Sequence, residues 1–570
     1  MLAIKEVSVQ VGPHTSSRML LNGVSASYPL SHFGAIIGPS GCGKTSLLRL
    51  IAGIAPGKED GEICWQGRSL ADEDFHASEI AYVPQFGIAH EELTARECVR
   101  FALALRVRHA DRDDQHHAVD NLIEEVGMRD FEHQAVKTLS GGQRRRLALA
   151  MELTSKPEIL LCDEVTSGLD PRSENDIVQL LQSQSRDAGR LVLSVTHSLA
   201  HLELYDSVLV LCRGVLAYHG SPVGLADYFG IETPESLYAC LDLRSPDDWG
   251  RLWRRHCAGL KQVSGVERGS AMEDRNADVN SLAHNFLPGP FSQFCTLFVR
   301  RVIVFSRSRS QMLLQMGFIF GFPLLVTLFA WNGLPAVANL SMGLGADPFQ
   351  QVIEAREFLS HSSKLGSLVS GIVMFQVILL TLMGANNSGR EIAAERPIFE
   401  KEKLSGLSPL AYIASKAVFL LLLICAQSVW MGVFVHSICG FPGDLAAQLA
   451  YLLLVNTAVT ATCLAISSLM PTPEQASLAS IYLVGFQLPL SGAVLALPEP
   501  IGTFVRPLIS AYWGWSGMLQ TLKQERYYDI VQSVVQSPLA PHPICVWILF
   551  THIATGLVVA WIGCERNHSA

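Results

Sequence analysis

The chain has 570 residues, which is more than one typical domain needs, so at least one further domain is expected beside the first. The formal net charge is −9 and only 17% of the residues are charged, which argues against a nucleic-acid partner. Mean hydropathy is +0.27 because long apolar segments dominate after about residue 290, and these segments exclude a soluble metabolic enzyme.

A phosphate-binding loop is predicted near the start of the chain, at Gly38, Pro39, Ser40, Gly41, Cys42, Gly43, Lys44 and Thr45. These residues fit the pattern G-x-x-x-x-G-K-[ST], and they lie between an apolar run that predicts a strand and a run from Ser46 that predicts a helix. We expect the loop and Ser46 to bind ATP through backbone N–H groups and the positive end of the helix dipole. Lys44 is expected to reach the β- and γ-phosphates, and Thr45 to bind Mg²⁺. A plain glycine-rich turn is the alternative.

Two adjacent carboxylates follow a second apolar run, Ile159–Cys162. An uninterrupted apolar run predicts a strand buried on both faces of a parallel sheet, and ligands bind at the C-terminal ends of such strands. We therefore expect Asp163 to contact Mg²⁺ through water and Glu164 to be the general base that polarises the attacking water. An ordinary surface pair of acids at a strand end is the alternative.

Four further short motifs follow in a fixed order and point to a family. Leu139, Ser140, Gly141, Gly142 and Gln143 resemble the signature sequence of ATP-binding cassette (ABC) ATPases. Gln85 resembles the glutamine loop of that family, Asp170 its D-loop and His197 its switch histidine. Each of these residues alone is usually structural, but their order and spacing around the phosphate loop resemble an ABC ATPase cassette.

The resemblance implies an ATP site shared between two cassettes. In this family the signature closes over an ATP held by a second cassette, Gln85 senses Mg²⁺ and faces the membrane domain, and His197 contacts the γ-phosphate. Asp170 makes a contact across the dimer. The chain has one signature and one phosphate loop, so a second chain is expected as partner, and a homodimer is favoured because every motif is intact. Arg144, Arg145 and Arg146, beside the signature, are interpreted as a solvated helix face.

The aromatic residue that this family usually stacks on adenine is missing from the corresponding stretch, Val9–His14. His14 or an apolar residue is left to take its place. A loose preference for the nucleotide base is therefore expected.

Six later segments are long and apolar enough to cross a bilayer. They are Met312–Trp331, Gly366–Ala385, Leu410–Cys439, Leu445–Met470, Ala476–Leu497 and Ile544–Cys564. Cationic residues gather before the first segment and between the second and third, which places the cassette and the C-terminus in the cytosol, at the plasma (inner) membrane for a bacterial protein. Free thiols are expected throughout, with a disulfide between Cys439 and Cys545 as the alternative.

Four parts are expected along the chain. Residues 1–235 predict an ABC nucleotide-binding domain, an α/β P-loop NTPase with a parallel-sheet core and a helical signature subdomain, and residues 236–290 predict a linker whose stretch Val263–Pro290 is polar. Residues 291–310 predict an amphipathic helix on the inner membrane surface, with an early cytosolic stretch of the first span as the alternative. Residues 311–570 predict an all-α domain of six spans, with a long outer loop at Pro335–Lys364.

A cassette placed before six spans resembles the G subfamily (White type) of ABC half-transporters, whose membrane domain is of ABC-2 type, and a bacterial relative in particular. Glu232–Tyr238 resembles a degenerate form of the Asn-Pro-Ala-Asp-Phe stretch of the subfamily. Glu391–Pro409 resembles its cytosolic loop between spans two and three, and Leu490–Pro498 the end of its fifth span.

The resemblance implies an ATP-driven exporter of a lipid-like or hydrophobic substrate that works among membrane lipids. The loop Glu391–Pro409 is expected to meet the cassette near Gln85 and to transmit motion. A substrate cavity lined by Phe375, Gln376, Asn456, Phe486 and Gln487 is one interpretation of the residues within the spans, and hydrogen bonds between neighbouring helices are the other. The alternative function is a non-transporting membrane ATPase that couples ATP turnover to an envelope or signalling partner.

Overall fold

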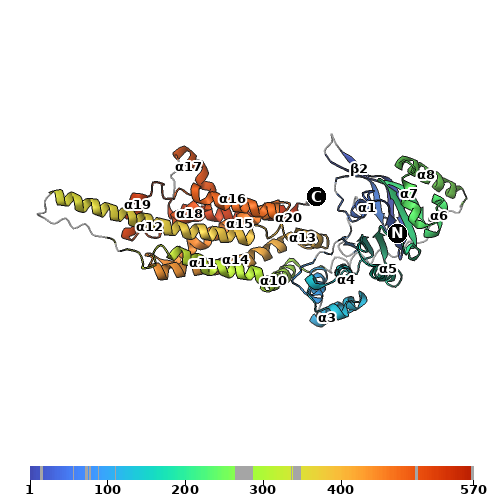
Figure 1. Ribbon diagram of the computed structural model, residues 1–570, viewed down its shortest axis with the longest axis horizontal. Helices are drawn as coiled ribbons and strands as arrows, with labels where there is room; N and C mark the ends of the chain where they lie inside the picture. The colour runs from blue at the N-terminus through green and yellow to red at the C-terminus, as the bar shows by residue number, and fades with distance from the viewer. Residues whose placement is uncertain are drawn as a thin grey trace. The chain divides into compact units, whose positions relative to one another are not determined.

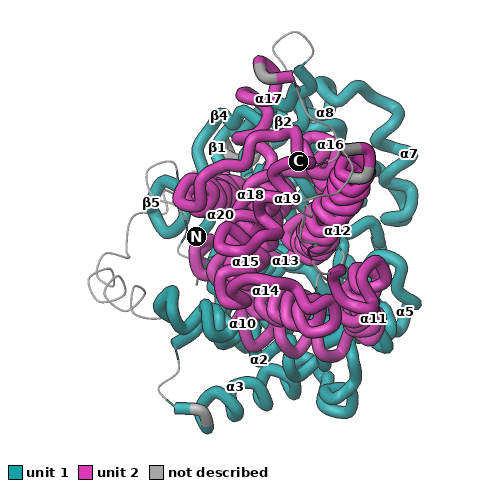
Figure 2. The backbone as a smooth tube through the Cα atoms, turned by 90° about the vertical axis from the view of Figure 1, so that its left-hand side faces the viewer, with its two compact units in different colours: residues 1–296, 400–407, 569–570 teal, residues 297–399, 408–568 magenta. Residues whose placement is uncertain are grey.

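The computed structural model describes residues 1–12, 17–55, 57–70, 75, 79–85, 87, 89–108, 111–263, 287–335, 337, 348–493 and 498–566. These residues fall into two compact units (Figure 2). Unit 1 comprises Met1–Thr296 and also Glu400–Leu407, and unit 2 comprises Leu297–Phe399 and the chain from Ser408 onward. Most of the predicted linker Val263–Pro290 lies outside the described residues.

The core of unit 1 is a six-stranded sheet in the order β10-β9-β3-β8-β7-β6. Its strands are β3 (Phe33–Ile37), β6 (Ile80–Val83), β7 (Ile159–Asp163), β8 (Leu191–Val195), β9 (Ser207–Cys212) and β10 (Val215–Gly220). Only the β9–β10 pairing is antiparallel. Every residue of β3, β7, β8 and β9 is buried, which explains why these strands read as unbroken apolar runs.

A second, antiparallel sheet of unit 1 has the order β2-β1-β4-β5. Its strands are β1 (Leu2–Val11), β2 (Arg18–Tyr28), β4 (Lys58–Trp65) and β5 (Arg68–Ser69). Alternate residues of β1, including Leu2 and Ile4, share one apolar core with Leu47 of α1 and Leu161 of β7.

The helices of unit 1 begin where the sequence supplies capping residues. Thr94 and Ser140 form capping boxes with Glu97 and Gln143 at the starts of α2 (Ala95–Arg106) and α4 (Gly141–Leu153). The other helices are α1 (Lys44–Ile51), α3 (Arg112–Glu125), η1 (Arg129–Phe131), η2 (Val136–Thr138), α5 (Pro171–Arg186), η3 (Leu202–Leu204), α6 (Pro222–Phe229), η4 (Pro234–Ser236), α7 (Leu237–Leu241) and α8 (Pro246–Val263). Figure 1 labels helices α1 and α3–α8 of this unit.

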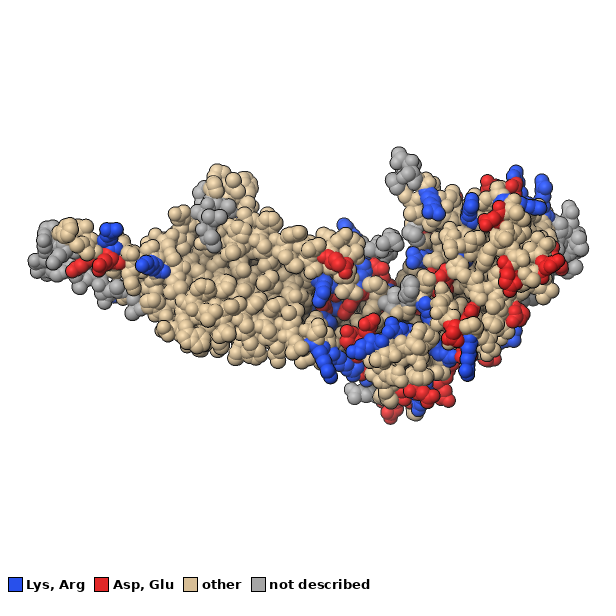
Figure 3. Space-filling model, viewed as in Figure 1, with Lys and Arg blue, Asp and Glu red and all other residues tan. Residues whose placement is uncertain are grey.

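Unit 2 is helical, and helix α10 (Pro290–Arg307) begins in unit 1 and continues into it. The following helices are α11 (Arg309–Thr327), α12 (Pro348–Ser388), α13 (Arg396–Leu404), α14 (Pro409–Cys439), α15 (Leu445–Leu469), α16 (Pro473–Leu490), α17 (Glu499–Val505), η5 (Arg506–Leu508), α18 (Ser510–Gln520), α19 (Arg526–Val534) and α20 (His542–Glu565). Helix α15 packs against α12, α14 and α20. On the face shown in Figure 3, charged atoms are sparse over the middle stretch of this unit.

Five helices among the described residues have the length and apolar composition to span a membrane: α11, α12, α14, α15 and α20. They match the first four and the last of the predicted spans. The fifth predicted span, Ala476–Leu497, corresponds to α16, which ends at Leu490 and is not among the five. The count of six therefore stays a prediction.

The segment predicted as a long outer loop, Pro335–Lys364, is a loop only in part. Helix α12 starts at Pro348 and runs for 41 residues, about twice the 20 that cross the hydrocarbon core. The hydropathy of the sequence predicted only the apolar half of this helix, because Glu354, Arg356 and Glu357 interrupt the apolar pattern in its first turns.

Cys439 and Cys545 are both free and buried, as expected.

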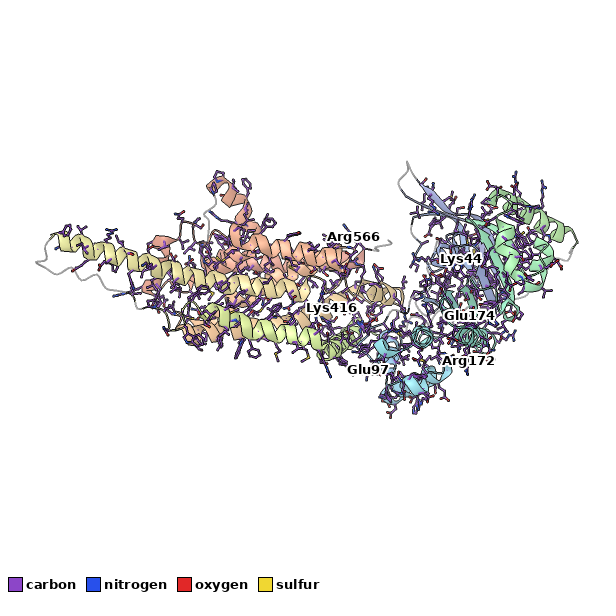
Figure 4. All side chains as sticks on the ribbon, in the orientation of Figure 1. Lys44, Glu97, Arg172, Glu174, Lys416 and Arg566 are labelled. Atoms are coloured by element: carbon purple, nitrogen blue, oxygen red, sulfur yellow. The ribbon has the colours of Figure 1, made fainter. Side chains whose placement is uncertain are left out.

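Buried polar side chains tie the helices of unit 2 together. Glu391 accepts from Arg301 of α10 at 2.7 Å and from Lys416 of α14 at 2.9 Å, and all three side chains are less than a tenth exposed (Figure 4 labels Lys416). Further along the helices, the side-chain amides of Gln315, Asn387 and Gln427 form a closed ring of three hydrogen bonds of 2.6–3.0 Å between α11, α12 and α14. Each of these six side chains has at least one hydrogen-bond partner, as burial favours.

Candidate functional site

The predicted phosphate loop connects β3 to α1 and has the conformation that the motif requires. Gly38 and Gly43 have φ of 152° and 104°. A Cβ at Gly38 would lie 2.3 Å from the carbonyl oxygen of Leu211, and one at Gly43 would lie 2.7 Å from that of Leu20. Only glycine fits at these two positions, so the loop lies close against β9 and β2 while its backbone stays free of side chains.

The Lys44 ammonium is folded back onto its own loop. Its Nζ atom donates to the carbonyl oxygens of Gly38 at 2.8 Å and Pro39 at 3.1 Å, and the side chain is 4% exposed (Figure 4). Burial lowers the pKa of Lys44, and the neighbouring charges of Glu164 and Asp163 are among those that oppose the shift. The cation is thus held where anionic oxygens would replace two neutral carbonyls as its partners.

Asp163 ends β7 beside the phosphate loop, as predicted. Its Oδ1 atom accepts from Thr45 Oγ1 at 2.9 Å and its Oδ2 atom from Tyr82 Oη at 2.9 Å. Burial raises the pKa of Asp163, although both hydrogen bonds oppose the rise. A buried carboxylate beside a hydroxyl is a set of oxygen donors that Mg²⁺ accepts, so Thr45 and Asp163 fit the predicted metal role.

Glu164 brings together two residues that lie far away in the sequence. Its Oε2 atom accepts from Gln85 Nε2 at 2.8 Å, and its Oε1 atom lies 2.6 Å from His197 Nε2. Its own backbone has φ of 49°, a left-handed conformation that is strained for glutamate, and its amide donates to the carbonyl of Val195 on β8. The strain turns the side chain at the end of β7 toward the glutamine and histidine loops.

The signature residues lie on a separate and exposed surface. Ser140 caps α4, and no hydrogen bond among the described residues joins Leu139–Gln143 to the phosphate loop of this chain. Asp170 caps α5 by accepting from the amides of Arg172 and Ser173, and the Ser173 bonds lower its pKa (Figure 4 labels Arg172). A Cβ on Gly142 would meet the Ser173 side chain at 3.6 Å, so the signature and the D-loop are neighbours.

The side chains of the three arginines after the signature contact other parts of the chain, and their interpretation as a solvated helix face is wrong. Arg144 donates to the carbonyl oxygens of Leu139 and Lys137, and Arg146 donates to Val126 and pairs with Asp176. Burial lowers the pKa of Arg145, and the charge of Glu164 opposes that shift.

Two tyrosines at the site were missed by the sequence analysis. Tyr82 of β6 binds Asp163, and Tyr238 of α7 donates to the carbonyl oxygen of His197 at 3.1 Å. Tyr82 lies only three residues before Gln85, but its contact depends on the pairing of β6 with β7, which the sequence does not state. Tyr238 lies at the end of the degenerate stretch Glu232–Tyr238, which was the only signal for it.

Part of the predicted cytosolic loop, Glu400–Leu407, belongs to unit 1 and contacts the end of the signature helix there, while its expected contact near Gln85 stays a prediction. Lys401 Nζ lies 2.7 Å from Glu152 Oε1 of α4, and Arg106 of α2 pairs with the same carboxylate at 3.0 Å. Burial raises the pKa of Glu152, but the two cations outweigh it and the pKa is lowered. Gln293 of α10 donates to the carbonyl oxygen of Gly406, so the loop has a second attachment.

The five candidate cavity residues differ in exposure and in their contacts. Gln376, Asn456 and Gln487 are at most 2% exposed, while Phe486 is 59% exposed. Asn456 donates to Ser428 and Gln487 accepts from the amide of Ala511, as expected of polar side chains that join helices. Phe375 packs edge-on against Phe329. The cavity stays a prediction, and His14, the candidate for adenine contact, lies outside the described residues.

Comparison with known families agrees with this arrangement. A family model described as "ABC transporter" matches residues 21–167, and a model described as "ABC-2 type transporter" matches residues 292–506. The first range holds the phosphate loop, Gln85, the signature and both acids, and the second holds α10 to α16.

Individual relatives extend over both ranges. The ABC transporter ATP-binding/permease protein Rv1747 of Mycobacterium tuberculosis is 29% identical over 96% of this chain. The ABC transporter G family member 31 of Arabidopsis thaliana is 25% identical over 90%, and the Protein white of Drosophila melanogaster is 34% identical over 38%. The chain spans 61%, 36% and 33% of the lengths of these relatives, respectively.

Solved structures of the ATP-binding cassette MJ0796, one of them in a post-hydrolysis state bound to ADP and Pi, also match. Each match covers 39% of this chain and 98% of the other, with 25% and 26% identity and a TM-score of 0.36.

Proposed function

We propose that this chain, which belongs to the ABC transporters with an ABC-2 type membrane domain, is one half of an ATP-hydrolysing exporter. The observation that carries the proposal is the grouping of Lys44, Asp163 and Glu164 at one end of the six-stranded sheet, with Gln85 and His197 bound to Glu164. These residues supply phosphate binding, metal binding and a base in one place.

Each residue of the site has its own role in ATP hydrolysis, which follows from its position. The phosphate loop and Lys44 bind the phosphates of ATP, and Thr45 and Asp163 hold Mg²⁺, which neutralises phosphate charge when bound. Glu164 orients the attacking water and accepts its proton. Gln85 and His197 hold the two carboxylate oxygens of Glu164, and they release it when the γ-phosphate and Mg²⁺ offer them other partners.

A second copy of the chain completes each ATP site. Ser140 and Gly141 are exposed and Gly142 is half-buried, and none of the three has a hydrogen bond with the phosphate loop of its own chain among the described residues. The N-terminus of α4 presents backbone N–H groups that suit a γ-phosphate held by another cassette. Because each motif occurs once and intact, a homodimer with two equal sites is favoured.

The buried ion group of Arg106, Glu152 and Lys401 couples ATP turnover to the membrane helices. Glu152 lies on α4, and the signature residues lie at the start of that helix. Closure of the dimer over ATP therefore moves the same rigid helix that Lys401 contacts. Lys401 belongs to α13, between the second and third apolar helices. Displacement of α4 is therefore passed to the helices on both sides of α13.

The substrate proposed for the dimer is a lipid-like or hydrophobic compound that moves outward across the plasma membrane. The apolar helices of unit 2 support a multi-pass protein among membrane lipids, and the cationic residues beside the predicted spans favour a cytosolic cassette and C-terminus. Phe486, which is exposed on α16, is the candidate for contact with such a compound at the face between two chains.

The test is ATP hydrolysis by the purified full-length chain in liposomes. Replacing Glu164 by Gln is expected to abolish turnover while ATP still binds, because the amide keeps the shape of the side chain but cannot accept the proton. Glu203→Gln, at a side chain that is 74% exposed, serves as the matched control and should hydrolyse ATP normally. Hydrolysis by the Glu164→Gln protein at the wild-type rate would refute the assignment. Hydrolysis stimulated by hydrophobic compounds or lipids supports transport.

A further inference from the structure

The segment between the two matched ranges holds His197 and contributes a further side chain to the ATP site. Helix α7 lies in this segment, and it is fixed to unit 1 by Leu237 and Leu241, which are 0% and 1% exposed. The indole of Trp249 donates to the carbonyl oxygen of Leu241 at 3.1 Å and ties α8 to the end of the helix. Tyr238 therefore extends toward the site from a firmly packed turn.

The hydroxyl group of Tyr238 lies between the two loops that meet the phosphates. It donates to the carbonyl oxygen of His197 at 3.1 Å. Burial raises the pKa of Tyr238 to about 12, and the main-chain amide of Gly38 opposes the rise, so this amide faces the same oxygen. One phenol thus touches the switch histidine through its carbonyl and the phosphate loop through its first glycine.

The two residues whose backbone Tyr238 contacts also contact or carry reacting side chains. The carbonyl of Gly38 receives the Lys44 ammonium at 2.8 Å, and the ring of His197 lies 2.6 Å from Glu164. On the chain around His197, Thr196 donates its amide to Ile36, and Ser198 donates its amide to the Thr196 hydroxyl. Of the His197 backbone, the carbonyl is the part that a side chain from outside the sheet holds.

We propose that Tyr238 is a positioning residue for ATP hydrolysis, which holds the backbone of His197 at a fixed distance from the phosphate loop. This inference rests on the proposed function. It predicts that loss of the hydroxyl slows the chemical step more than it weakens ATP binding, because the phosphate loop binds ATP whether or not His197 is aligned. The proposal also requires that Tyr238 act only through His197.

The experiment compares steady-state ATP hydrolysis by Tyr238→Phe, Tyr228→Phe and Glu164→Gln variants of the full-length chain. Tyr228 is the matched control, because its buried hydroxyl has no hydrogen-bond partner among the residues that the structure describes. We expect kcat of Tyr238→Phe to fall about five-fold with KM nearly unchanged, since one hydrogen bond of about 1 kcal/mol corresponds to that factor. The Tyr228→Phe variant should keep both wild-type constants.

A double variant separates positioning from a purely structural role. In a chain that already carries His197→Ala, adding Tyr238→Phe should cause no further loss, because the residue through which Tyr238 acts is gone. Independent, multiplying losses would overturn the inference. So would a wild-type kcat for Tyr238→Phe, or a melting temperature well below that of Tyr228→Phe. Failure of the proposed function is distinguishable, because it shows as retained turnover in Glu164→Gln.

Discussion

The contact between Lys401 and Glu152, on which the proposed coupling depends, contributes a measurable part of the free energy of unfolding. The two side chains are 9% and 3% exposed and their charged atoms are 2.7 Å apart, so the pair is screened little by solvent. Replacing Lys401 by Met removes a charge-assisted contact, which lowers the free energy of unfolding by about 1.5–3 kcal/mol. The loss stays below the roughly 3–5 kcal/mol of an unpaired buried charge, because Arg106 remains bound to Glu152.

The functional effect of Lys401→Met should differ from that of an ATP-site variant. We expect basal ATP hydrolysis to continue while stimulation by a transported compound disappears, because α13 no longer follows α4. Lys137→Met, at an exposed lysine of the same unit, is the matched control and should leave both activities intact.

A double-mutant cycle measures the interaction itself. Chains carrying Glu152→Gln, Lys401→Met or both are unfolded by heat in the same lipid, and the coupling energy is taken from the departure from additivity. A coupling energy of about 1–2 kcal/mol is expected for a pair in direct contact. Effects that add to within about 0.5 kcal/mol would show that the two charges do not interact, and the reasoning would then be refuted.

Two further predictions concern stability. Burial disfavours the charged form of Asp163 and raises its pKa. The neutral carboxyl group therefore contributes to the stability of the folded protein below the ordinary carboxyl pKa, and this contribution is lost as the pH rises through the pKa of the folded state. Asp163→Asn should therefore melt at a higher temperature than wild type at pH 7.5 without nucleotide or Mg²⁺, and the difference should shrink toward about pH 4; a lower melting temperature at pH 7.5 would contradict this. Gln427→Leu opens the amide ring and strands one group on Gln315 and one on Asn387, so unfolding in lipid nanodiscs should become easier by about 1–2 kcal/mol; an unchanged melting curve would show that the ring adds no stability.

The parts of the ATP site that come from contiguous motifs were predictable from the sequence. The loop Gly38–Thr45 carries its own geometry in the spacing of its glycines, and Asp163 and Glu164 follow a strand whose burial on both faces is visible in the apolar run. The grouping of Gln85 and His197 with Glu164 followed from the family resemblance. The structure adds the distances of 2.8 and 2.6 Å.

Contacts that depend on how elements pack were not predictable. Tyr82 reaches Asp163 because β6 is the edge neighbour of β7, and Tyr238 of α7 reaches the carbonyl of His197 in the loop after β8. Which strands and helices lie beside one another leaves no pattern in the local sequence.

The membrane unit shows the same limit in another form. A helix that is apolar on all sides does not reveal which face meets its neighbours, so the sequence could not decide whether Gln376 and Asn456 line a cavity or join helices. In the structure both side chains are buried, and Asn456 donates to Ser428. Helix α12 was predicted at half its length because hydropathy detects its apolar turns and not the polar turns from Pro348 onward.

The central claim, that two chains share each ATP site, is tested most directly by mixing two inactive variants. Lys44→Ala disables the phosphate loop and Ser140→Arg disables the signature, while Ser221→Arg removes a similar helix cap at α6 and should stay active. Each of the first two proteins alone should fail to hydrolyse ATP. Co-assembled at equal amounts in a two-fold dimer, they should recover about a quarter of wild-type turnover, because half of the dimers then hold one intact site. No recovery on mixing, or full activity of Ser140→Arg alone, would contradict the shared site.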